Sequence, residues 1–180
     1  MADSFDALFG DREMVKAEIK ELEAALKEQQ RALKSCDKAL EQKRKAVNKE
    51  VKVVAARVLK GHTFLQNKLP GWTKKVVLRD LMMEDGQVCV LGQLHAKSAL
   101  RSAGYAINPD SDTRYTEACN VLGLGDGVAF GFDISESYDG CDIPQEASYE
   151  VLNHLWERAI RLTKGNRAVT VESLTKDLLF

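Results

Sequence analysis

Apolar residues in the first third of the chain recur at spacings that alternate between four and three. Together with Gln29 and Cys36 they form one seam: Val15, Ile19, Leu22, Leu26, Leu33 and Leu40. This alternation is the a/d pattern of a coiled coil. Residues 11–60 contain neither glycine nor proline and are rich in residues that favour helix. The pattern predicts one long helix that ends at Gly61 as its C-terminal cap, and hence an N-terminal coiled-coil arm over residues 1–60.

The seam changes phase after Leu40. It passes through Arg44 and continues on four valines, Val47, Val51, Val54 and Val58. An insertion of four residues in a heptad pattern is a stutter, which locally unwinds a supercoil. Gln29 is polar, and a polar seam residue helps to fix the register of paired helices at some cost in stability.

A narrow apolar stripe on so long a helix needs a partner surface. Either copies of the chain pair through this helix, or the helix folds back on itself as a hairpin. A hairpin needs a breaker, and residues 12–60 contain no glycine or proline. We therefore predict a homo-oligomer that pairs through the six apolar seam residues. The number of helices and their orientation stay open at this point.

Residues 62–180 have the mixed pattern of a small, compact α+β domain. Asp85-Gly86 lies between the apolar runs KKVVLRDLMM and QVCVLGQL, which predicts a β-hairpin. Helices are predicted over 93–102 and 113–122, and an amphipathic helix is predicted after Pro144. The tail AVTVESLTKDLLF predicts a short strand and then a helical turn. The predicted fold class is α+β, mostly helical, with a long coiled-coil helix before a domain that holds a β-hairpin and several helices.

Charge is distributed unevenly along the chain. The 180 residues include 26 basic and 27 acidic ones, but residues 38–79 hold twelve basic and two acidic residues, a net charge of +10. Residues 1–37 hold six basic and nine acidic residues, and the last 101 hold eight and sixteen. A candidate contact for an acidic partner follows: Lys43, Arg44, Lys45, Lys49, Lys52, Arg57 and Lys60. The partner is either an acidic protein surface, such as another copy, or a nucleic-acid backbone. The lack of interleaved aromatic residues weighs against nucleic acid.

Few features indicate a membrane, a metal or a cofactor. The start of the chain is acidic where a secretory signal is basic, and no stretch of 18 uncharged apolar residues occurs. We therefore expect a cytoplasmic protein without a membrane partner. Four scattered cysteines and three isolated histidines, His62, His95 and His154, lack the close pairs of a zinc site. No metal and no cofactor are predicted.

The glycine-rich and acidic stretches do not match known ligand loops. Residues 123–131 hold four glycines but lack the Lys-Ser/Thr pair of a P-loop. Asp133, Ser135, Ser137 and Asp139 alternate as calcium ligands do, but the glycine and the final Glu of that loop are absent. Residues 110–112 have the spacing of an acidic metal-binding pair, although a helix cap is the more common role of such a loop.

Two Cys/His combinations have the composition of a nucleophile and its base. Cys89 with His95, or Cys141 with His154, would need the thiolate within hydrogen-bond reach of the imidazole. Cys89 lies in the apolar run Val88–Leu91, which is typical of a buried strand. We predict no catalytic residues and a protein that is not an enzyme.

Short motifs from Gly71 onward resemble a family of small proteins of unknown function in actinobacteria and their phages. The resemblance covers residues 71–163 and rests on Gly71-Trp72, Leu78-Arg79-Asp80, Asp85-Gly86-Gln87-Val88-Cys89-Val90-Leu91-Gly92, Glu150-Val151-Leu152 and Arg158-Ala159-Ile160. The usual Trp-Asn-Asp stretch is replaced by Phe132-Asp133-Ile134-Ser135. The resemblance implies a phage-encoded or actinobacterial protein and brings no activity with it.

The sequence thus predicts a non-enzymatic binding or structural protein. It oligomerises through the N-terminal coiled coil and contacts another protein in the cytoplasm, the host cytoplasm if a phage encodes it. The alternative is a nucleic-acid-binding protein that uses the basic residues of segment 38–60.

Overall fold

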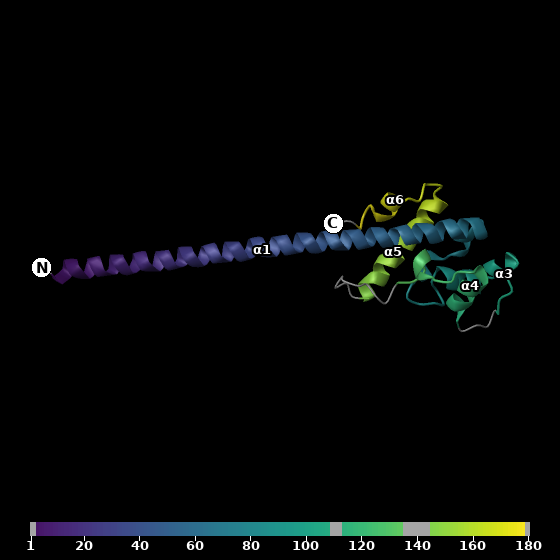
Figure 1. Cartoon of the computed structure of the whole chain (residues 1–180), viewed down its shortest axis with the longest axis horizontal. Coiled ribbons are helices and arrows are strands. Elements are labelled where there is room, and N and C mark those ends of the chain that lie inside the picture. The colour runs from purple at the N-terminus through teal and green to yellow at the C-terminus, as the bar shows by residue number, and fades with distance from the viewer. Residues whose placement is uncertain (1–2, 109–112, 135–144, 179–180) are drawn as a thin grey trace. The chain divides into compact units, whose positions relative to one another are not determined.

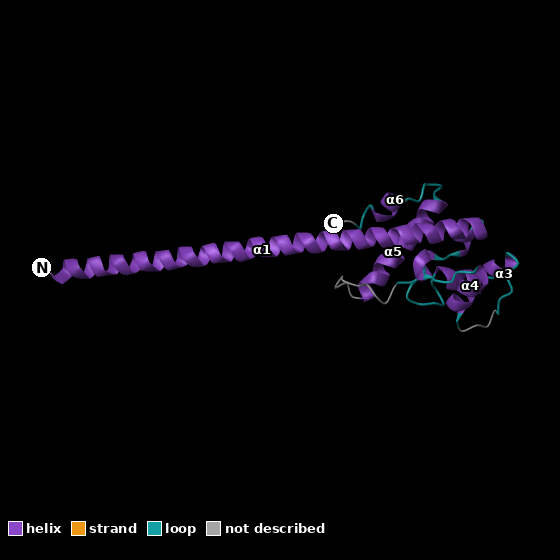
Figure 2. Ribbon diagram, viewed as in Figure 1, coloured by secondary structure: helices purple, strands orange, loops and turns teal. Residues whose placement is uncertain are grey.

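The chain is described by a computed structural model over residues 3–108, 113–134 and 145–178, and side chains are described except at 3–11 and 145–147. Every regular element in these ranges is a helix, and none of these residues is assigned to a strand (Figure 2). The predicted β-hairpin is therefore absent, and the α+β fold class is wrong. The fold of the described residues is all-helical.

The first helix, α1, spans Asp3–Lys68 and runs through both compact units of the chain, Met1–Lys45 and Ala46–Phe180 (Figure 1). From here on, the arm means the first unit, Met1–Lys45, and the body means the second unit, Ala46–Phe180. The prediction that Gly61 ends this helix is wrong, because α1 continues to Lys68. Gly61 is instead a packing residue, since a Cβ atom there would lie 2.1 Å from the carbonyl oxygen of Phe130.

Several short helices and one longer helix follow α1 in the body. Three single turns are η1 (Trp72–Lys75), η2 (Leu78–Asp80) and η3 (Val128–Phe130). The α-helices are α2 (Val90–Ala96), α3 (Ala99–Ser102), α4 (Arg114–Leu122), α5 (Gln145–Lys164) and α6 (Val171–Thr175). The helix predicted over 113–122 is confirmed as α4. The helix predicted over 93–102 is split into α2 and α3.

The segment around Asp85-Gly86 turns into a helix instead of a hairpin. The backbone N–H of Gln87 donates to a carboxylate oxygen of Asp85 at 2.8 Å, and the N–H of Cys89 donates to its carbonyl at 2.8 Å. Cys89 then caps α2, because its Sγ accepts from the N–H of Gly92 at 3.3 Å. A short apolar run cannot by itself distinguish a strand from a buried helix, and here the run QVCVLGQL forms the start of α2.

The core of the body combines buried residues of α1, α2, α4, α5 and α6. The predicted amphipathic helix is confirmed as α5, whose apolar face is buried through Leu152, Leu155, Trp156, Ala159 and Ile160. The Trp156 ring stacks on Phe132 with centroids 4.9 Å apart and meets Trp72 edge-on at 5.9 Å. Between α1 and α5, His62 Nε2 and Thr163 Oγ1 are 2.7 Å apart.

The last part of the described chain contains one helix and no strand. Thr170 and Ser173 form a reciprocal capping box at the start of α6. The predicted short strand before it is wrong, because residues 167–170 have no regular structure and the cap starts the helix at Val171.

Candidate interaction surfaces

The arm presents a row of exposed apolar side chains. All six predicted seam residues, Val15, Ile19, Leu22, Leu26, Leu33 and Leu40, are between 50% and 65% exposed. Cys36, on the same seam, is also exposed. Large exposed apolar side chains arranged in a contiguous row mark an interaction surface. The arm therefore carries an unpartnered apolar seam, which we call the arm seam.

The same helix uses its apolar side chains differently in the body. Val51, Val54 and Val58 are buried, with Val58 fully inaccessible to solvent. These valines pack within the body, so they are not free to pair with another helix. The second apolar seam of the predicted arm over residues 1–60 is thus part of the body's own core.

Ion pairs along the arm are local and exposed. Lys16 Nζ lies 2.6 Å from Glu13, and Glu41 meets both Arg44 and Lys45, at 3.1 and 3.6 Å. Exposed pairs of this kind stabilise a helix by only about 0.3–0.5 kcal/mol each. Most of the stability of a helix in a protein comes from packing of its apolar face, so these pairs do not replace a partner for the arm seam.

The predicted basic residues are accessible but belong to both units. In the arm, Lys43, Arg44 and Lys45 are exposed. In the body, Lys49, Lys52 and Lys60 are exposed and share one face of α1 by their spacing, whereas Arg57 is half-buried.

Two of the basic residues in the body have neighbours. Lys60 Nζ lies 4.2 Å from the centre of the Phe130 ring, in a cation–π contact. The pKa of the Glu172 carboxyl is lowered by hydrogen bonds from its own backbone N–H and the Thr170 side chain, and Lys52 adds to the shift. The body thus offers a basic face on which Lys49 and Lys52 are exposed.

The geometry does not assemble the first Cys/His combination. Burial raises the pKa of Cys89 to about 11, which keeps the thiol protonated near neutral pH. Its Sγ contacts the backbone of Gly86 and Gly92, whereas His95 Nε2 lies 2.9 Å from a carboxylate oxygen of Glu117. Cys89 and His95 therefore have separate partners, and both serve the packing of α2 and α4.

Other candidate ligand sites fall partly or wholly outside the described residues. These are Cys141, the acidic residues 110–112 and positions 135–144 of the calcium-like stretch. The described Asp133 accepts hydrogen bonds from the Tyr149 hydroxyl and the Ile134 N–H, both at 2.8 Å. No group of three or more His, Cys, Asp or Glu side chains suited to a metal ion occurs among the described residues.

The glycine-rich stretch 123–131 packs against α1. Gly131 has a φ of +65°, and a Cβ atom there would lie 2.6 Å from the backbone nitrogen of Val58. The stretch includes η3, and it brings Phe130 over α1 at Gly61. Gly131 thus allows two backbones to approach closely, which is a structural role.

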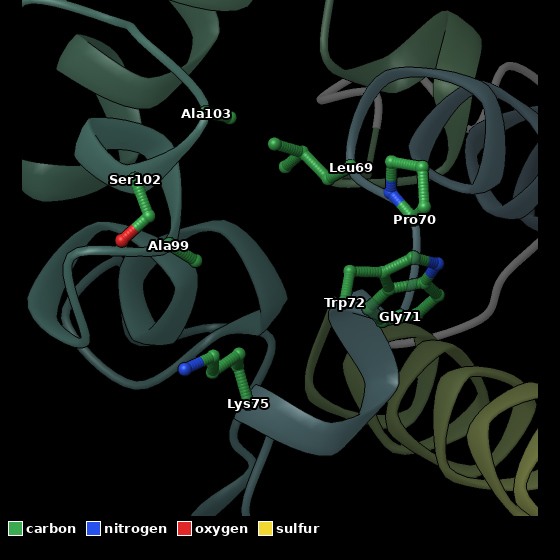
Figure 3. Close-up of a pocket in the computed structure, with 8 residues that line it drawn as sticks. All are labelled: Leu69, Pro70, Gly71, Trp72, Lys75, Ala99, Ser102 and Ala103. Atoms are coloured by element: carbon green, nitrogen blue, oxygen red, sulfur yellow. The ribbon is translucent and has the colours of Figure 1, made fainter.

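A pocket of about 290 Å³ lies beside the Gly71-Trp72 motif. It is lined by Leu69, Pro70, Gly71, Trp72, Lys75, Ala99, Ser102 and Ala103. Figure 3 shows Leu69 and Pro70 on one side of the space and the α3 residues on the other. Its volume is near the lower end for small-molecule sites, about 300 Å³, and its polar side chains are few. Sequence reasoning noted Gly71-Trp72 as a motif and did not predict this pocket.

A smaller hollow of about 130 Å³ is lined by His154, Glu157, Arg158 and Arg161 on α5. Its two arginines are already paired. Arg158 donates to the Ser173 carbonyl and to Asp177, and Arg161 donates to Glu157 at 2.5 and 2.9 Å. With both cations engaged, the hollow holds little unpaired charge for an anion.

None of the helices that the structure describes has the length and apolar character needed to cross a membrane. Comparisons of the chain with protein-family models, with curated proteins and with solved structures found no match. The functional argument therefore rests on the surfaces of the chain itself.

Proposed function

We propose that this chain is a non-enzymatic binding or structural protein that forms homo-oligomers through its arm and contacts another protein. The observation that carries the proposal is the arm seam, whose six apolar residues are at least half exposed. Burying an apolar side chain of this size contributes about 1.5–3 kcal/mol when burial is complete. Six half-exposed residues per copy therefore supply a substantial driving force for association.

The regular spacing of the arm seam favours another helix as its partner. Alternating spacings of four and three keep the six residues on one stripe of the helix, where knobs-into-holes packing buries them. A flat or irregular partner surface would not require this periodicity. A second copy of the arm provides the same stripe at equal concentration, which makes self-association the simplest solution.

The contacts of the catalytic candidates support a non-enzymatic role. Cys89 caps a helix, His95 pairs with Glu117, and the glycines near η3 allow close packing. Each group is accounted for by the packing of the body. The resemblance to the actinobacterial and phage family supports a phage-encoded or actinobacterial origin, and with it a cytoplasmic location.

Substitution of arm-seam leucines by charged residues should abolish self-association. We expect sedimentation equilibrium of the full chain to give a mass above one copy, and the double variant Leu26→Glu, Leu33→Glu to give a single-copy mass. Two buried carboxylates per chain cost far more than the pairing of exposed helices returns. The variant Ala17→Glu, Ala24→Glu is the matched control, because both positions lie away from the seam. A single-copy mass for the unmodified chain at every concentration would refute the proposal.

The alternative function is nucleic-acid binding through the basic face of α1. It is favoured by the exposure of Lys49, Lys52 and Lys60 on one face. Phosphate contacts release counterions, so binding must weaken steeply with salt. A series of DNA mobility shifts between about 50 and 200 mM salt distinguishes the two functions. A protein with about 6–10 phosphate contacts loses about 10³–10⁵-fold in affinity over that range. The variant Lys49→Glu, Lys52→Glu should lose such binding and keep the oligomeric mass.

A further inference from the structure

We infer that the partner of the arm seam is the arm of a second copy running antiparallel. This inference rests on the proposed self-association and adds its orientation and register. It starts from the two rows of residues that flank the seam, because these rows meet different neighbours in parallel and antiparallel pairs. In heptad terms, Ile19, Leu26, Leu33 and Leu40 occupy position a, and Val15 and Leu22 occupy position d.

The two flanks of the seam differ sharply in chemistry. The residue before each of three a positions is alanine, at Ala25, Ala32 and Ala39. The opposite flank, after each d position, is polar or charged: Lys16, Glu23, Gln30 and Asp37. All of these residues are exposed in the single chain. The arm thus has one flank of small side chains and one flank of polar ones.

Antiparallel pairing keeps like flanks together. The alanine flanks of the two helices then face each other, which allows close approach on that side, and the polar flanks face each other on the opposite side. Parallel pairing instead sets each alanine flank beside a polar flank. It also brings Glu18 of one helix against Glu23 of the other, twice by symmetry, and like charges at such positions are destabilising.

The seam residues and the ends of the arm select a register. When the pair is centred on residue 24, Leu26 of each helix packs against Leu22 of the other, and Leu33 packs against Val15. Gln29 then faces Ile19, and residues 3–45 of the two helices overlap. Moving the centre to between residues 27 and 28 would set Leu26 against Gln29 and leave residues 3–9 outside the overlap.

The ends of the arm are complementary in charge. The first eleven residues contain three aspartates and no basic residue, whereas residues 38–45 contain four basic residues and one acidic residue. An antiparallel pair places the acidic start of one helix beside the basic end of the other. A parallel pair would place like charges together at both ends. Because this attraction is between exposed groups, it is screened by salt.

Cys36 makes the orientation measurable. In a parallel pair, Cys36 at position d would face its own counterpart and form an interchain disulfide on oxidation. In the proposed antiparallel pair it faces Arg12. Position 25 behaves in the opposite way. In the antiparallel pair, Ala25 of one helix lies opposite Ala25 of the other near the centre, whereas in a parallel pair the two Ala25 residues lie apart.

Two single-cysteine arms test the inference. Both full-length proteins carry Cys141→Ser; one keeps Cys36, and the other carries Cys36→Ser with Ala25→Cys. After diamide oxidation, we expect a covalent dimer on a non-reducing gel for the second protein and none for the first. A covalent dimer through Cys36, through both positions or through neither in a sample of oligomeric mass would overturn the antiparallel register.

Sedimentation equilibrium on the same two proteins before oxidation separates this result from the proposed function. If both have a single-copy mass, self-association itself fails, and the antiparallel inference fails with it. If both are oligomeric, the gel reports orientation alone. Cys89 and Cys119 are present in both proteins and are buried, so they contribute equally to any background.

Discussion

At the scale of single residues, the closest approach in the body is between α1 and the loop that holds η3. Gly61 and Gly131 face this contact from the two sides, one against the Phe130 carbonyl and the other against the backbone of Val58. Neither glycine can be exchanged for a larger residue without moving a backbone. Lys60 adds its cation–π contact with Phe130 at the same place. The contact therefore depends on residue size more than on polarity.

The substitution Gly61→Ala tests this size requirement. Alanine favours helix over glycine by about 1 kcal/mol, but its Cβ would lie 2.1 Å from the Phe130 carbonyl oxygen. Overpacking of this kind costs about 1–3 kcal/mol or more, so we expect a net loss in the free energy of unfolding measured with urea. Gly125→Ala is the control, because no atom lies within 4 Å of a Cβ there. Equal stability of the two variants would show that the loop yields freely.

At the scale of helices, α1 serves two units with one apolar pattern. Leu26 and Val54 both lie on predicted seams of α1, yet Leu26 is 55% exposed and Val54 is 5% exposed. Periodicity predicted the helix and both seams, because it depends only on which residues are apolar. It could not predict that the second seam packs within the body, since the same stripe fits a neighbouring segment of the same chain or of another.

Local pattern also misled the prediction around Asp85-Gly86. The dipeptide does form a turn, but Cys89 ends that turn as a helix cap instead of starting a strand. The Gly61 cap and the hairpin failed for the same reason: Gly61 and Gly86 were interpreted through backbone conformation, whereas Gly61 lies against the Phe130 carbonyl and Gly86 lies against Tyr115. Close approach between elements is a tertiary property that one sequence does not display. The arm seam is exposed within the described arm, and its pairing with another helix stays a prediction.

Truncation should locate the start of the body. Deletion of residues 1–45 removes the arm and leaves Val51, Val54 and Val58 in place, so we expect a cooperative thermal transition by near-ultraviolet circular dichroism of Trp72 and Trp156. Deletion of residues 1–61 removes these buried valines as well, and loss of a single large core side chain costs about 2–5 kcal/mol. We expect the shorter chain to lack the transition. Cooperative unfolding of both chains would place the body boundary later than residue 61.

At the scale of the whole molecule, the chain divides its stability between two different sources. The body buries its apolar residues within one chain, around Trp72, Phe132 and Trp156. The arm has its seam exposed and is held by local ion pairs that contribute little. An arm that gains its packing from a second copy must therefore respond to protein concentration, whereas the body must not.

Thermal unfolding at several concentrations should separate these two sources. We expect the far-ultraviolet signal, to which the arm contributes strongly, to show a transition whose midpoint rises with concentration, because association stabilises only the paired state. The near-ultraviolet signal of Trp72 and Trp156 should keep a constant midpoint, since both residues lie in the body. In Leu26→Glu, Leu33→Glu the first transition should lose its concentration dependence while the second is unchanged. Concentration dependence of the tryptophan signal instead would mean that the body itself is the oligomer interface, and the arm seam would then need a different partner.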